Sequence, residues 1–151
     1  MGKREDMIAA EERSWNELHA LVADLTTEDM EARGMGPDEW SVKDAMWHLG
    51  CWTAEGAQQL EAIRLGTYVE QDWDNMDELN DKMTAEGRRQ DLATVKTELT
   101  SARNRALQEF GAIDTITPEV EEWFSEGGPE HTDEHLSELK AWIAQLESRR
   151  G

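Results

Sequence analysis

Apolar side chains recur every three or four residues through four long segments of this chain, and this period limits the possible folds. It is the period of an amphipathic α-helix, in which 3.6 residues complete one turn. The segments predicted to be helical cover residues 4–25, 41–65 and 91–110, and a last one that starts near residue 129. The pattern predicts an all-α fold, a four-helix bundle with short extra helices, formed by residues 1–151 as a single domain.

Two sequence signals define the second long helix. Ser41, followed three residues later by Asp44, is a capping-box pattern that predicts a helix start. Gly66 predicts its end, because glycine readily adopts the left-handed conformation that closes many helices. His48 then falls on the apolar face of this helix, in its N-terminal half.

Shorter elements are predicted between the long helices. Residues 76–86 carry a helical pattern, and Thr-Pro at 117–118 predicts the start of a short helix that ends near Phe124. We expect residues 26–37 to form a loop, because paired threonines and a Gly-Met-Gly-Pro run interrupt the period. Gly-Gly-Pro at 127–129 predicts a break before the last helix.

The net charge of the chain excludes several classes of partner. Fifteen Lys and Arg residues face 34 Asp and Glu residues, so the formal net charge is −19. Such a chain repels phosphate backbones, and we expect no nucleic-acid partner. It has no basic cluster to bind anionic lipid and no run of 18 apolar residues, so we expect no membrane partner.

The remaining sequence features suit a soluble cytoplasmic protein. Cys51 is the single cysteine, so no intramolecular disulfide can form. The first residues lead into an amphipathic pattern instead of a signal peptide. A homodimer is compatible with a helical bundle, although no apolar seam on a predicted helix marks one.

Three of the four histidines are placed where a metal site can form. His131 and His135 lie four residues apart on the predicted last helix, so their rings share one face. They extend the apolar stripe of Leu139 and Ile143, and burying unpaired imidazoles there is costly unless a shared metal satisfies them. His48 would supply a third nitrogen. Three nitrogens with an open coordination position suit a divalent metal such as zinc, nickel, copper or iron.

The residues leave alternatives open at these positions. His131 also fits an exposed residue in the first turn of the helix, and His19 fits an ordinary half-exposed histidine. The order His-Thr-Asp-Glu-His lacks the H-E-x-x-H pattern of zinc proteases, which disfavours that chemistry.

Two segments resemble motifs of the DinB-like (damage-inducible) four-helix metalloprotein superfamily. Trp-Ser-Val-Lys-Asp at residues 40–44, followed by His48 and Trp52, resembles its second-helix motif. His-Thr-Asp-Glu-His-Leu at residues 131–136, continuing to Trp142, resembles its last-helix motif. With a looser likeness over the third-helix region, the resemblance covers nearly the whole chain.

The resemblance implies a DinB-like bundle that holds nickel or zinc through His48, His131 and His135. The superfamily includes metal-dependent thiol transferases that use bacillithiol, mycothiol or glutathione, and mycothiol-dependent maleylpyruvate isomerases. It also includes hydrolases that protect producers from reactive natural products. In the isomerase branch one ligand is glutamate, so two histidines on the last helix are nearer to the transferase pattern.

We therefore expect a metal-dependent transferase or isomerase that uses a low-molecular-weight thiol, of mycothiol or bacillithiol type, on small-molecule electrophiles in detoxification. Glu55 is the candidate catalytic residue, because it lies two turns from His48 on roughly the same side and can accept a proton. The alternatives are a metal-dependent hydrolase, a non-catalytic small-molecule-binding protein, and a bundle with a purely structural metal.

Other residues have two interpretations each. Cys51 is either a nucleophile activated by the metal or a small buried apolar residue. Asp44 either supports a ligand imidazole or caps its helix. Trp52 is expected either in the core or in the wall of a pocket beside the metal. Arg88 and Arg89 are either charges at the end of a helix or a binding site for the carboxylates of a low-molecular-weight thiol.

Overall fold

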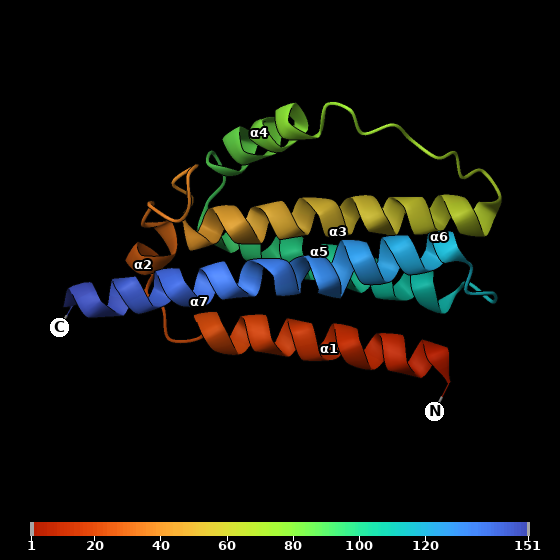
Figure 1. Ribbon diagram of the computed structural model, residues 1–151, viewed down its shortest axis with the longest axis horizontal. Coiled ribbons are helices and arrows are strands. Elements are labelled where there is room, and N and C mark those ends of the chain that lie inside the picture. The colour runs from red at the N-terminus through yellow and green to blue at the C-terminus, as the bar shows by residue number, and fades with distance from the viewer. Residues whose placement is uncertain (1, 151) are drawn as a thin grey trace.

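The computed structural model describes residues 2–150, and most of these residues are helical (Figure 1). The long helices are α1 (Lys3–Val22), α3 (Val42–Leu65), α5 (Leu92–Gly111) and α7 (His131–Arg150). The shorter elements are α2 (Thr27–Glu31), α4 (Met76–Gly87), α6 (Pro118–Glu121) and the π-helix η1 (Glu122–Glu130). The predicted all-α bundle with short extra helices is confirmed.

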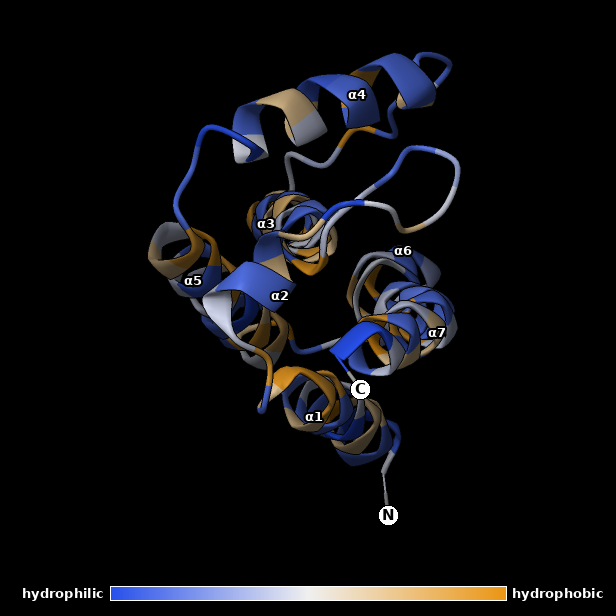
Figure 2. Cartoon of the chain, turned by 90° about the vertical axis from the view of Figure 1, so that its left-hand side faces the viewer, coloured by the Kyte–Doolittle hydropathy of each residue, from blue (hydrophilic) through white to orange (hydrophobic). Residues whose placement is uncertain are grey.

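The four long helices surround a common core when the molecule is viewed end-on (Figure 2). Helix α4 lies outside this bundle, against α3. The loop after α3 runs back along that helix before α4 begins (Figure 1). One group of buried apolar residues includes Leu18, Leu49 and Leu139, and a second includes Leu60 and Phe110. None of the helices within residues 2–150 is long and apolar enough to cross a membrane.

Both ends of α3 lie where the sequence predicts them. The Ser41 hydroxyl accepts the Asp44 N–H at 3.0 Å, and the Asp44 carboxylate accepts the Ser41 N–H at 3.0 Å. Gly66 closes the helix in the left-handed conformation, with φ 77°. These end groups fix the register of the helix that carries His48.

The loop predicted over residues 26–37 is wrong in its first part, where α2 forms. Thr26 and Asp29 make a capping box there, with hydrogen bonds of 3.0 and 3.1 Å between each backbone N–H and the other side chain. The second part of the prediction is confirmed, since residues 32–41 form a loop with one backbone bridge between Met35 and Trp40. Gly34 is required in it, because its φ is 142° and a Cβ would lie 2.7 Å from the Trp142 ring.

The break predicted at residues 127–129 is also wrong. Elements α6, η1 and α7 follow one another without an intervening loop. Pro129 lies inside the π-helix. A π-helix shifts the hydrogen-bond register by one residue, which lets the helix pass a proline that would break a regular α-helix. The regular α-helix resumes at His131.

The capping geometry predicts a measurable contribution of Ser41 to stability. Ser41→Ala removes the side-chain acceptor at the start of α3 and should lower the free energy of unfolding by about 1 kcal/mol. Urea unfolding followed by circular dichroism measures the change. Ser101→Ala, at an exposed position on α5, is the matched control and should change little. Equal stability of the two variants would contradict this role of the capping box.

Candidate metal centre

Three imidazole rings meet between α3 and α7. The Nε2 atom of His131 lies 3.1 Å from that of His48 and 3.2 Å from that of His135. One ring nitrogen from each of the three residues lies within 4.8 Å of the others. The structure therefore brings together all three histidines that the sequence analysis selected. The same arrangement excludes an exposed, unattached His131.

The neighbours of these rings keep them in position. His48 is only 6% exposed, and its ring centroid lies 5.0 Å from that of Trp40, in the loop before α3. Trp40 also stacks on His135 at 6.1 Å. At the start of α7, the buried Ser14 hydroxyl of α1 lies 2.8 Å from an Asp133 carboxylate oxygen, which fixes the turn between the two ligand positions.

Burial keeps the three imidazoles neutral at pH 7. Loss of hydration, followed by the neighbouring His131 and His135, lowers the pKa of His48 to about 3. Loss of hydration also lowers the pKa of His131 and of His135 below the ordinary histidine value. A neutral imidazole presents a nitrogen lone pair, which is the form that binds a metal.

The chemistry of the donor set fits one divalent metal ion. Three neutral nitrogens meet from two helices, and the remaining side of the cluster faces a cavity, so a fourth position stays open. Metal binding at Nε2 leaves the proton on Nδ1. In His48 this Nδ1 is buried and has no hydrogen-bond partner among the described residues. Among the described residues, only the Nε2 atom of this ring has a polar neighbour, so the cost of burying the imidazole can be offset only through Nε2.

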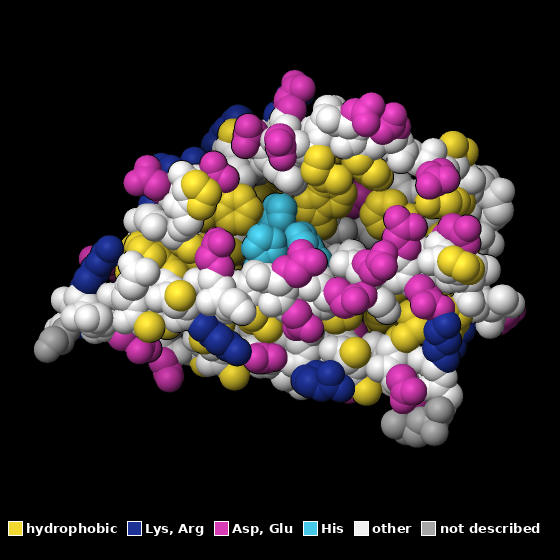
Figure 3. All heavy atoms as spheres, in the orientation of Figure 1, with side chains coloured by type: hydrophobic (Ala, Val, Ile, Leu, Met, Phe, Trp, Pro, Cys, Tyr) yellow, Lys and Arg dark blue, Asp and Glu magenta, His cyan; other side chains and the backbone are white. Residues whose placement is uncertain are grey.

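The cavity beside the histidines has a volume of about 850 Å³, which is enough for a small organic molecule. Figure 3 shows the histidine side chains grouped in a hollow, with hydrophobic side chains beside them and acidic side chains around them. The walls come from the loop before α3, from α3 itself, from α4 and from η1. Trp52 lines this cavity, as one of its two sequence interpretations expects.

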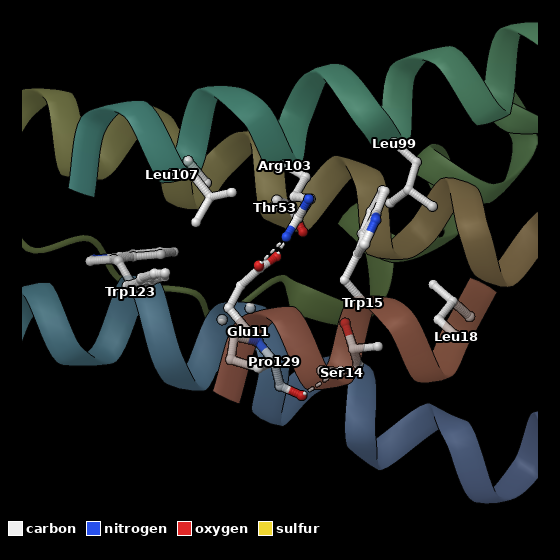
Figure 4. Close-up of a pocket in the computed structure, with 15 residues that line it drawn as sticks. Glu11, Ser14, Trp15, Leu18, Thr53, Leu99, Arg103, Leu107, Trp123 and Pro129 are labelled. Atoms are coloured by element: carbon white, nitrogen blue, oxygen red, sulfur yellow. Dashed lines mark hydrogen bonds and ion pairs between the residues drawn. The ribbon is translucent and has the colours of Figure 1, made fainter. Parts of the chain in front are cut away.

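A second cavity, of about 40 Å³, lies inside the bundle and is too small for a substrate. Figure 4 shows Arg103 of α5 directed at Glu11 of α1 across it. Their two hydrogen bonds measure 2.7 and 2.8 Å, and the Arg103 guanidinium also lies 4.7 Å from the centre of the Trp15 ring. This ion pair joins α1 to α5, which is a structural role.

The other candidate residues lie away from the histidine cluster. Glu55 does not line the large cavity, and its carboxylate accepts a hydrogen bond from the Gln59 amide at 2.9 Å. Its catalytic role stays a prediction. Asp44 caps α3 and pairs with Arg88 at 3.3 Å, so neither residue faces the cavity. His19 is exposed and packs on Trp15.

Cys51 lies on another side of α3. It lines a groove between α3 and α5 that contains none of the three clustered histidines. Burial, with Glu86 and Glu98 nearby, raises the pKa of its thiol to about 11. Cys51 is therefore a thiol at neutral pH, and the nucleophile interpretation has no geometric support.

Most residues of the cavity wall are not among those predicted from the sequence. The acidic residues in the wall are Asp38, Asp77, Asp81, Glu122 and Glu126. Four of them form pairs spaced four residues apart on α4 and η1, which is a signal visible in the sequence. A solvated helix face carries the same spacing, so the signal becomes specific only when both helices are placed against α3.

Comparison with protein families finds one match over most of the chain. Residues 10–144 match the model of the DinB superfamily. No curated protein and no solved structure matches the chain significantly. The matched range contains all three clustered histidines.

The low pKa of His48 predicts acid sensitivity of the metal-free protein. Between its folded pKa of about 3 and the ordinary value of 6.5, the unfolded state binds a proton that the folded state does not, so stability falls as the pH falls. Between pH 6.5 and pH 5, His48→Leu should lose about 2 kcal/mol less stability than the wild type. Urea unfolding with chelator at both pH values measures this. His19→Leu is the control, and a wild-type response in His48→Leu would refute the effect.

The raised pKa of Cys51 predicts slow alkylation. At pH 8, iodoacetamide should modify it roughly 10- to 100-fold more slowly than it modifies free cysteine, because so little thiolate is present. Mass spectrometry over time gives the rate, and modification in urea gives the unfolded reference. A rate in the folded protein equal to that reference would contradict the prediction.

Proposed function

This chain belongs to the DinB superfamily, and on that premise we propose that His48, His131 and His135 hold one zinc or nickel ion for chemistry on small molecules. The observation that supports the proposal most is the meeting of three neutral imidazoles at the wall of a cavity of about 850 Å³. A metal with three imidazole ligands and an open position supplies a Lewis acid that lowers the pKa of a thiol or of water.

We propose a transferase that joins a low-molecular-weight thiol to a small electrophile. In that reaction the thiol gives its proton to a base and its sulfur bonds to the electrophilic carbon, while the leaving group of the electrophile, such as a halide, departs with the electron pair of its bond to that carbon. The three histidines stay neutral and keep their Nε2 lone pairs directed at one point, while Trp40 holds two of the rings in place. Among residues 2–150, no Lys or Arg lines the cavity, which favours a thiol without free carboxylates, as in the mycothiol class, over bacillithiol or glutathione.

The acceptor of the thiol proton is proposed to be a carboxylate. Glu55 is the acceptor that the sequence analysis selected, and Glu126 lines the cavity directly. Comparing Glu55→Gln with Glu126→Gln separates the two, since only the variant of the true acceptor loses turnover without losing the metal. A cytoplasmic location, which the single cysteine and the amphipathic start of the sequence suggest, and a homodimer, which is compatible with a helical bundle, are further proposals.

Metal content tests the first part of this proposal. Protein purified without chelator or nickel resin should contain about one divalent metal ion per chain, and His135→Ala should lose it. Elemental mass spectrometry gives the stoichiometry, and His19→Ala, an exposed histidine off the site, should retain the metal. Absence of metal in the wild type, even after incubation with zinc and nickel, would refute the proposed site.

Thiol dependence tests the second part. Metal-loaded protein should conjugate an activated aryl halide with mycothiol, and the rate should fall to background in His135→Ala. Consumption of a substrate without any thiol would identify a hydrolase instead. A tight one-to-one complex with no turnover would identify a binding protein. Failure to conjugate with any common bacterial thiol would refute the transferase proposal.

A further inference from the structure

The wall of the large cavity carries a concentrated negative charge. Five carboxylates line it, on the loop before α3, on α4 and on η1: Asp38, Asp77, Asp81, Glu122 and Glu126. Within residues 2–150, none of the five forms an ion pair with a Lys, an Arg or a His. A concave surface with charges of one sign focuses its potential into the cavity and raises the local concentration of ions of the opposite sign.

The spacing of these carboxylates is unfavourable in the absence of a cation. Asp77 and Asp81 lie four residues apart on α4, and Glu122 and Glu126 are four residues apart on η1. Like charges at this spacing repel each other and destabilise a helix. Helices α4 and η1 both pack against α3, so both pairs belong to the wall of one cavity. A positively charged ligand would relieve the repulsion within each pair.

Three tryptophans form a row in the same wall. Trp52 and Trp73 meet edge to face at 5.4 Å between ring centroids, and Trp73 meets Trp123 edge to face at 6.1 Å. Hydrogen bonds hold the outer two rings: the Trp52 indole donates to Asn80 at 2.9 Å and the Trp123 indole to the Tyr68 hydroxyl at 3.2 Å. Indole rings attract cations and bury apolar groups, so the row suits an organic cation.

An inorganic ion fits this wall less well than an organic cation does. Among the described residues, the three histidines form the one group whose ligand atoms approach one another closely enough to share a metal ion. The five carboxylates are spread over three elements and do not meet at one point. Spread-out charge beside aromatic rings suits a larger, weakly hydrated cation such as an organic ammonium.

We propose that this cavity selects substrates with a positively charged nitrogen and an apolar body, such as substituted ammonium compounds. The nitrogen lies between the tryptophan row and the carboxylates, and the rest of the molecule extends towards His48, His131 and His135. The assignment of this cation as a substrate depends on the metal-dependent function proposed above, whereas its binding to the wall does not. The charge and the rings come from residues other than the metal ligands.

A matched set of probes tests the selection: benzyltrimethylammonium as the cation, benzyl alcohol as the neutral molecule and phenylacetate as the anion. Isothermal titration and quenching of tryptophan fluorescence measure binding to the full chain. We expect saturable binding of the cation, weaker binding of the alcohol and none of the anion. The double variant Asp81→Asn with Glu122→Gln should weaken cation binding by about tenfold. Both positions are exposed, so the fold is retained, and circular dichroism confirms it.

Two controls separate this inference from the proposed function. Glu119→Gln, an exposed carboxylate of α6 outside the cavity, should bind the cation as the wild type does. His135→Ala, which lacks a metal ligand, should retain cation binding within about threefold, since no metal is needed at the tryptophan row. Equal binding of anion and cation, an unchanged affinity in the double variant, or stoichiometric displacement of the probe by calcium would overturn the inference.

Discussion

The meeting of three imidazoles between α3 and α7, of which His48 is buried and His131 and His135 are half-buried, is the interaction on which the architecture of the site depends. They occupy positions that continue apolar stripes, and His48 has a buried Nδ1 without a partner among the described residues. Unpaired polar groups at such positions are destabilising. A metal ion shared through Nε2 would bond one nitrogen of each ring and so offset part of the cost of burying them, while the Nδ1 of His48 keeps no partner among the described residues. The site is then a cross-link between the second and the last long helix, and binding of the metal stabilises their packing.

The irregular elements of the fold help to bring the three imidazole rings together. The π-helix η1 carries the chain through Gly-Gly-Pro without a loop, so α7 begins at the first ligand position. Gly56 of α3 allows η1 to approach closely, because a Cβ there would lie 3.0 Å from the Trp123 carbonyl oxygen. The loop before α3 places Trp40 against His48 and His135. Helix α4, outside the bundle, then completes the wall of the cavity.

Much of this could be predicted from the sequence where the signal is local. Ser41 and Gly66 define α3 through interactions within a few residues, and the four-residue spacing of His131 and His135 places both rings on one face. The contribution of His48 follows from its place on an apolar stripe. Packing of the long helices as a bundle is then enough to bring His48 close to His131 and His135.

The rest depends on contacts between distant segments. Gly-Gly-Pro is a break in most contexts, and packing of η1 against α3 makes it a π-helix here. The capping box of α2 has the same spacing and the same Asp as that of α3, but only five helical residues follow it, too few to show an apolar helical period in the sequence. The acidic pairs on α4 and η1 look like solvated surface until tertiary structure places them around one cavity. The prediction for Glu55 assumed that its side chain shares a face of α3 with His48. In the structure its carboxylate accepts a hydrogen bond from the Gln59 amide.

X-ray absorption spectroscopy at the metal edge of zinc-loaded protein tests the central claim most directly, because it counts the ligands and identifies them. A single zinc held by His48, His131 and His135 predicts three imidazole nitrogens at about 2.0–2.1 Å, with a fourth light atom in the open position. In His135→Ala, the imidazole count should fall and the metal should be lost on dialysis. A wild-type spectrum dominated by carboxylate oxygens, or with one imidazole or none, would contradict the shared three-histidine site.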